Sequence, residues 1–138
     1  MREILFRAKA INRDKGYHKT KYKNGDWVYG LITQLYDERF ENLPAEMRNT
    51  DGVNGIEVDY KTFGQFTGLT DKGGTKIFEG DILRDDDNEE NGVVLFFEGE
   101  YCVSFDNNFT YGFADIACSC YVIGNIHDNP ELLNGGVE

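Results

Sequence analysis

The chain has 138 residues, of which 40% are hydrophobic, 28% are charged and 19 are aromatic. This length predicts a single domain, and the apolar content is sufficient for a core that needs neither a disulfide nor a metal ion. The composition excludes a wholly disordered chain. No apolar run approaches the ~20 residues that cross a bilayer, and the first residues lack the apolar core of a signal peptide. We therefore expect a cytoplasmic protein whose three cysteines are reduced thiols.

The charge is distributed unevenly along the chain. The formal net charge is −11, but residues 1–34 contain eight basic and three acidic residues, whereas residues 35–138 contain six and 22. Because so acidic a surface repels nucleic acid and anionic lipid, we expect no direct nucleic-acid partner and no membrane partner. The Lys-rich segment 13–23 is interpreted as a solvated loop or hairpin tip. A local contact between this segment and phosphate stays open.

Strand patterns open the chain. Apolar side chains at Ile4, Phe6, Ala8 and Ala10 alternate with mostly charged ones, which predicts a strand with one apolar face. The dipeptide Asn24-Gly25 predicts a type I′ hairpin turn. The aromatic and β-branched residues that follow are typical of a second strand, which we expect at residues 27–36.

One short helix is expected before the middle of the chain. Phe40, Leu43 and Met47 recur at helical spacing within residues 37–49. Because proline interrupts helical hydrogen bonding, Pro44 limits this helix to one or two turns.

The rest of the chain is expected to consist of strands separated by turns. The clearest hairpin joins residues 93–97 to residues 101–105 through Glu98-Gly99-Glu100. Near the end, Asn129 is expected to cap a single helical turn that begins at Pro130. The other expected strands are residues 56–60, 63–69, 77–83 and 119–126, with a turn at residues 71–74.

These elements predict a mainly β protein, α+β at most. The expected architecture is an antiparallel sheet or a small barrel-like β domain with one or two short helices packed outside. No fixed-period repeat and no long linker occurs in the sequence.

The acidic loop at residues 85–90 has part of the pattern of a metal site. Asp85, Asp87 and Glu89 alternate as in a calcium loop, which requires Gly at its sixth position and Glu at its twelfth. Those positions hold Glu90 and Phe96, so the match fails. We interpret the segment as a solvated loop, and a binding role for it stays open.

The cysteines and histidines form no recognisable site. Cys118 and Cys120 are expected on one face of a strand, and with Cys102 and His127 they can be drawn as a zinc site. Structural zinc prefers cysteine pairs with a wider spacing, so small apolar strand residues are the better interpretation. Neither His18 nor His127 has a nucleophile or carboxylate at motif spacing. We therefore assign no catalytic, cofactor-binding or metal-binding residue and expect no enzyme.

Three segments carry a family resemblance. The longest is residues 62–82, with the sequence TFGQFTGLTDKGGTKIFEGDI. The other two are residues 2–8, REILFRA, and residues 121–133, YVIGNIHDNPELL. Residues 2–8 resemble the opening strand of the YopX family, residues 62–82 its central signature and residues 121–133 its closing motif. These are small proteins of bacteriophages and prophages, chiefly of Gram-positive bacteria.

The resemblance implies one YopX-like domain over residues 1–138. Its expected parts are an N-terminal hairpin and short helix at residues 1–60, a signature β region at 61–133 and a tail at 134–138. It also implies a homo-oligomer in the cytoplasm of a bacterial host, and it transfers no catalytic residue. The motif Glu79-Gly80-Asp81 is interpreted as a turn whose carboxylates accept backbone N–H groups, with a surface contact as the alternative.

Three functions follow as hypotheses. The first is a phage- or prophage-encoded accessory protein that acts by protein–protein contact and self-assembly, with a host or phage protein as a further partner. The second is an acidic DNA mimic that inhibits a host nucleic-acid-binding protein, suggested by the net −16 of residues 35–138. The third is a small hydrolase or metal-dependent enzyme that uses Asp81, Asp85 or His127.

Overall fold

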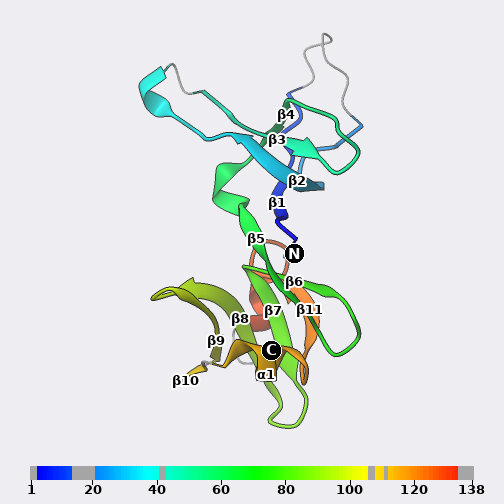
Figure 1. Ribbon diagram of the computed structural model, residues 1–138, viewed down its shortest axis with the longest axis vertical. Helices are drawn as coiled ribbons and strands as arrows, with labels where there is room; N and C mark the ends of the chain where they lie inside the picture. Colours follow the sequence, from blue (N-terminus) through cyan, green and yellow to red (C-terminus); the bar gives the residue numbers. More distant parts are fainter. Residues whose placement is uncertain (1–2, 14–20, 41–42, 106–107, 111, 134–138) are drawn as a thin grey trace. The chain divides into compact units, whose positions relative to one another are not determined.

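The computed structural model describes residues 3–13, 21–40, 43–105, 108–110 and 112–133 (Figure 1). The chain forms two compact units. The N-terminal unit comprises residues 4–65, and the C-terminal unit comprises residues 66–138 together with residues 1–3. His18 and most of the Lys-rich segment lie outside the described residues.

The N-terminal unit is an antiparallel sheet with the strand order β4-β3-β2-β1-β5. After β1, Ala10 forms a bridge with Val58, and the N–H of Ile11 donates to the carbonyl of Glu57 at 2.9 Å. The first strand therefore returns to β4, and the sheet curls around its own core without a continuous closing ladder. Its elements are β1 (Phe6–Lys9), β2 (Trp27–Gln34), η1 (Glu38–Phe40), β3 (Ala45–Asn49), β4 (Ile56–Val58), η2 (Tyr60–Thr62) and the first residues of β5 (Gly64–Thr70).

The first strand is buried on both faces rather than on one. Ala8 and Ala10 lie in the core, as their alternation predicts, but Ile4 is 62% exposed. Leu5 and Arg7, expected on the exposed face, are buried. The guanidinium of Arg7 lies 4.6 Å from the centre of the Trp27 ring, so β2 covers this side of β1 as well. The core consists of Ala8, Ala10, Val28, Ala45, Met47, Ile56 and Val58.

The turn before β2 is where the sequence predicts it, but it is of another type. The N–H of Asp26 donates to the carbonyl of Lys23 at 3.0 Å. Gly25 has φ +88°, whereas Asn24 is not among the non-glycine residues with positive φ. A type I′ turn needs positive φ at both central residues, so that part of the prediction is wrong.

The predicted helix at residues 37–49 is wrong. Among the described residues of this segment only η1 is helical, and strand β3 follows, with Ala45, Met47 and Asn49 buried alternately. Positions four residues apart share a face in a strand as well as in a helix, so the spacing of Leu43 and Met47 fits both. Pairing with β2 and β4 decides in favour of the strand.

The C-terminal unit has a sheet with the order β10-β9-β8-β7-β11, beside which the second half of β5 pairs with β6. In the part of the chain that the structure describes, neither sheet closes into a barrel. The mainly β prediction is confirmed. The elements are β6 (Lys76–Phe78), β7 (Asp81–Asp85), β8 (Glu90–Phe97), β9 (Glu100–Phe105), β10 (Asn108–Thr110), α1 (Phe113–Ala117), β11 (Tyr121–Asn125) and η3 (Pro130–Leu133).

Several local predictions in this unit are confirmed. The β8–β9 hairpin ends at the pair Phe97 and Glu100, and both residues of its loop, Glu98 and Gly99, have positive φ. The helical turn η3 begins at Pro130, as expected. The core side chains are Ile77, Leu83, Val94, Val103, Phe105, Phe113, Ala117 and Cys120.

Candidate functional site

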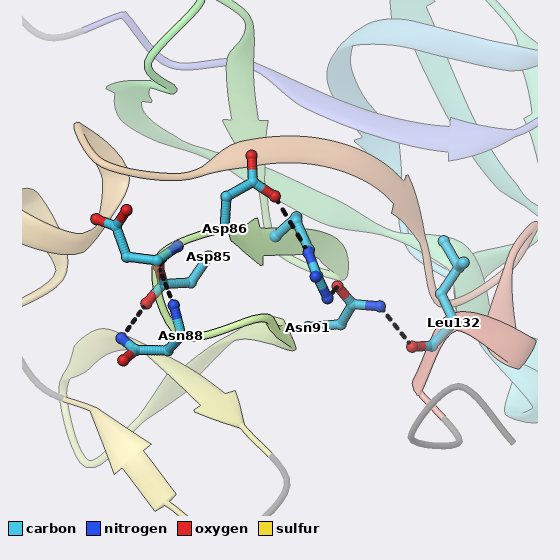
Figure 2. A network of polar contacts seen from close by, with 7 residues as sticks. Asp85, Asp86, Asn88, Asn91 and Leu132 are labelled. Carbon is cyan, nitrogen blue, oxygen red and sulfur yellow. Dashed lines mark hydrogen bonds and ion pairs between the residues drawn. The ribbon is translucent and has the colours of Figure 1, made fainter.

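The acidic loop between β7 and β8 is organised by its first carboxylate (Figure 2). One oxygen of Asp85 accepts the backbone N–H groups of Asp87 at 3.1 Å and Asn88 at 3.4 Å. Its other oxygen accepts the side-chain amide of Asn88 at 2.7 Å. This is an Asx turn, in which the Asp85 carboxylate stabilises the conformation of the loop. The residues from Asp86 to Glu90 are exposed.

A polar chain connects this loop to the C-terminal helical turn (Figure 2). Arg84 donates to Asp86 at 3.2 Å and to the side-chain oxygen of Asn91 at 3.3 Å. The amide of Asn91 in turn donates to the backbone carbonyl of Leu132 at 2.9 Å. The carboxylates of Asp87, Glu89 and Glu90 remain as the outward charges of a loop whose backbone is fixed.

The Glu79-Gly80-Asp81 motif forms the predicted turn. Asp81 is 2% exposed, and its carboxylate accepts the N–H of Phe78 at 2.7 Å. Gly80, with φ +86°, donates its N–H to Val94 and accepts the N–H of Ile126, both at 2.9 Å. The prediction that a carboxylate of this motif accepts a backbone N–H is confirmed for Asp81.

The closing motif meets this turn at one corner of the sheet, because Asn125 pairs with Asp81. The side-chain oxygen of Asn125 accepts the N–H groups of His127 and Asp128, both at 3.0 Å. Its amide donates to the Asp128 carboxylate at 3.1 Å, and Asn129 accepts the N–H of Asn125 at 3.3 Å. In the signature and the closing motif, the side chains of Asp81, Asn125 and Asn129 therefore bind backbone N–H groups.

The three residues of the enzyme hypothesis do not converge. Asp81 and Asp85 are the first and last residues of β7, which places them about 13 Å apart along an extended strand. His127 lies beside Gly80, at the Asp81 end. In the described ranges, no group of three or more His, Cys, Asp or Glu side chains is placed to hold a metal ion.

The cysteines occupy three different environments. Cys102 and Cys120 are buried, and burial raises the pKa of both thiols; the charge of Glu100 adds to the effect at Cys102. Cys118 is exposed at the end of α1, and Cys120 precedes β11. The expectation that Cys118 and Cys120 share a strand face is therefore wrong, because Cys118 caps the end of helix α1 and Cys120 lies in the short connection between that helix and β11.

Asp71 is a structural residue that the sequence analysis did not single out. One of its oxygens accepts the N–H groups of Gly73 and Thr75, at 2.8 and 2.9 Å. The other accepts the N–H of Val122 in β11 at 2.9 Å. At the far end of β11, Asn129 takes the N–H of Asn125. Side chains of the same chain thus occupy both ends of the outer edge of β11, which hinders the addition of a further strand.

Exposed apolar side chains are the second feature that the sequence analysis missed. Nine large hydrophobic residues of the N-terminal unit and four of the C-terminal unit are exposed among the described residues. Those of the N-terminal unit are Ile4, Tyr29, Leu31, Leu35, Tyr36, Phe40, Leu43, Val53 and Tyr60, and those of the C-terminal unit are Phe96, Phe97, Tyr121 and Ile123. Exposed apolar side chains that lie together mark contact surfaces, whereas singly scattered ones are ordinary.

The family model for YopX protein matches residues 6–134. The chain belongs to the YopX family. The resemblance inferred from the three motifs is therefore confirmed over nearly the whole chain. A search of curated proteins gives no match.

Among solved structures, protein EF1440 from Enterococcus faecalis is similar, with a TM-score of 0.59 and 23% sequence identity. The match covers 97% of this chain and 100% of that one, which shows that the two share a fold. As for membranes, every helix within the described residues is too short or too polar to cross a bilayer.

Proposed function

We propose that this YopX-family protein is a phage- or prophage-encoded accessory protein of the bacterial cytoplasm that acts by protein–protein contact, including self-assembly. The observation that carries the proposal is the set of nine exposed large hydrophobic side chains on the N-terminal unit. Where such side chains lie together, as the stacked rings of Tyr36 and Tyr60 do, they form the kind of surface that proteins use for contacts. The polar residues of the two family motifs support the same view, because they hold backbone in place.

The experiment is sedimentation velocity over a concentration series, combined with a tagged pull-down eluted in salt steps. Self-assembly predicts a reversible oligomer whose population grows with concentration. A strict monomer that also captures no phage or host protein would end the proposal. The origin is checked separately, because the coding gene is expected to lie among phage genes.

The DNA-mimic hypothesis remains as a second candidate, supported by the charge of the C-terminal unit. Residues 66–138 contain 15 acidic and three basic side chains, whereas residues 4–65 contain nine and ten. A fixed loop presents Asp87, Glu89 and Glu90 outward from the acidic unit. A mimic predicts a basic, nucleic-acid-binding partner that elutes from the pull-down at low salt. A partner that resists salt would contradict it.

A further inference from the structure

The connection between β2 and β3 carries four exposed large apolar side chains, and a fifth lies in η2. We name this group the arm patch, and its members are Leu35, Tyr36, Phe40, Leu43 and Tyr60. Figure 1 shows the connection running out from the ends of β2 and β3, with η1 at its far end. Because hairpin connections of soluble proteins are normally polar, we expect a binding partner to cover this apolar group.

The backbone that presents the patch is fixed by its own hydrogen bonds. Asp37 and Leu43 form an antiparallel bridge with N–H to carbonyl distances of 3.1 and 3.0 Å. Arg39 makes two side-chain bonds to the carboxylate of Asp37, at 3.1 and 3.0 Å. The charges of Asp37 and Arg39 thus pair with each other. The backbone conformation that presents the apolar side chains is therefore preorganised for binding.

The patch is also tied to the body of the unit. The rings of Tyr36 and Tyr60 stack with their centroids 4.6 Å apart and an angle of 8° between the planes. Tyr60 opens the helical turn η2, which follows β4. Residues from two separate segments therefore form one apolar surface.

The exposed area is sufficient for a symmetric contact. Leu35 and Phe40 are 66% and 60% exposed, and Tyr36, Leu43 and Tyr60 are between 37% and 43% exposed. At about 200 Å² per side chain, these fractions leave roughly 500 Å² on each chain. Two copies that met through this patch would bury about 1,000 Å² in total, which reaches the lower limit for a specific protein interface.

Charge favours a second copy as the occupant of this particular unit. Residues 4–65 are nearly neutral, with ten basic and nine acidic side chains, so two N-terminal units meet without strong repulsion. The C-terminal units, each with a net charge of −12, repel one another. A two-fold axis also needs only one surface that is complementary to itself, and an aromatic and aliphatic patch meets that condition.

We propose that the arm patch is the contact by which two copies of this chain form a symmetric dimer. The inference rests on the self-assembly part of the proposed function and names the surface responsible. The contact itself is apolar, so salt does not weaken it. Added salt screens the repulsion between the two acidic C-terminal units. The dimer therefore holds or tightens as salt rises from about 50 mM to about 500 mM.

The test compares two double variants of the full-length chain by sedimentation velocity. Leu35→Ser with Phe40→Ser removes the two most exposed side chains of the patch. Phe97→Ser with Ile123→Ser is the matched control, because these residues are 45% and 40% exposed on the other unit. We expect the first variant to weaken dimerisation at least about 100-fold and the control to leave it unchanged. Circular dichroism and thermal unfolding establish that both variants remain folded.

A cross-link gives an independent measurement. Glu38→Cys in a Cys118→Ser background places one thiol in the arm, and a short bismaleimide is expected to join two copies there. Glu89→Cys in the same background, which lies in the acidic loop, is expected to remain uncoupled.

The outcomes separate this inference from the proposed function. If the wild type dimerises and the arm variant dimerises equally well, the patch is not the contact, while self-assembly stands. If the wild type stays monomeric at all concentrations and captures no phage or host protein, both fail. If the wild type is monomeric but the arm variant loses a phage or host protein, the occupant is that protein and the dimer is overturned.

Discussion

The carboxylate of Asp71 accepts the backbone N–H of Val122 at 2.9 Å, across 51 residues of sequence. Its second oxygen holds the turn that follows it by accepting the N–H groups of Gly73 and Thr75. Next to it, the N–H of Lys72 donates to the carbonyl of Cys120 at 3.0 Å. One acidic side chain thus closes its own turn and attaches the family signature to the closing strand.

This attachment affects how the protein makes contacts. With both ends of the outer edge of β11 occupied, strand addition there requires the loss of native bonds. Contacts through exposed side chains carry no such cost. The occupied edge of β11 and the exposed arm patch therefore both favour association through side chains over association by strand addition.

Asp71→Asn is expected to lower the free energy of unfolding by about 2 kcal/mol, because a charged acceptor of three backbone N–H groups becomes a neutral one. Urea unfolding measures the change. Asp87→Asn is the control, because Asp87 is an exposed residue of the acidic loop, and it is expected to change stability little. Equal stability of the two variants would show that the Asp71 bonds are not needed.

Gly92→Ala is expected to destabilise the protein by about 1–3 kcal/mol through overpacking. A Cβ atom at this position would lie 2.6 Å from Val103 and 2.7 Å from Phe105, both in the core. Gly73→Ala is the matched control, because its nearest neighbours are at 3.5 Å, an ordinary contact distance. Thermal unfolding compares the stability of the two variants. A Gly92→Ala protein as stable as the control would contradict the packing described for β8 and β9.

Glu98→Asn is expected to stabilise the protein by about 0.5 kcal/mol. Glu98 occupies a left-handed conformation, with φ 51°, in the two-residue loop of the β8–β9 hairpin. Asparagine tolerates this conformation better than glutamate does, and Asn-Gly is the preferred pair for such a turn. Glu100→Asn, in the neighbouring strand, should bring no gain. Chemical denaturation compares the two, and a loss of stability in Glu98→Asn would argue against the type I′ geometry.

Local patterns predicted the features that depend on neighbouring residues. The glycine of the β8–β9 loop, the turn at Gly80 and the start of η3 at Pro130 are all visible in short stretches of sequence. The helix predicted around Phe40 failed in part because the four-residue spacing of Leu43 and Met47 fits a strand as well as a helix. What decided the outcome was pairing with β2 and β4, which no local pattern reports.

The candidate surfaces depend on longer-range information still. Asp71 was recognisable as part of a turn, but its bond to Val122 depends on where the last strand lies. Helix α1 has five residues and begins after Gly112 without a side-chain cap, so it is too short for a periodic signal. Two members of the arm patch, Phe40 and Leu43, were interpreted in the sequence as part of the apolar side of a helix, whereas the structure places Phe40 in η1 and Leu43 before β3, where both are exposed.

The three thiols are expected to differ in reactivity, and the two buried ones are expected to make stability depend on alkaline pH. Burial raises the pKa of Cys102 and Cys120. In the unfolded chain these thiols ionise at their ordinary pKa of about 8.5, whereas in the folded protein they remain protonated to higher pH. Their contribution to stability is therefore complete below about pH 8.5 and is lost as the pH rises above that value. Urea unfolding between about pH 7.5 and about pH 10 should show the decline.

The matched variants are Cys120→Ala and Cys118→Ala, since the first thiol is buried and the second is exposed. Cys120→Ala is expected to flatten the alkaline decline, although it also costs stability at neutral pH through the small cavity that it leaves. Cys118→Ala removes an exposed thiol and is the control for the substitution itself. Under native conditions, a thiol reagent should modify Cys118 rapidly and the other two only after unfolding. Rapid modification of Cys120 in the folded protein would contradict its place in the core, where it packs with Leu83 and Phe113.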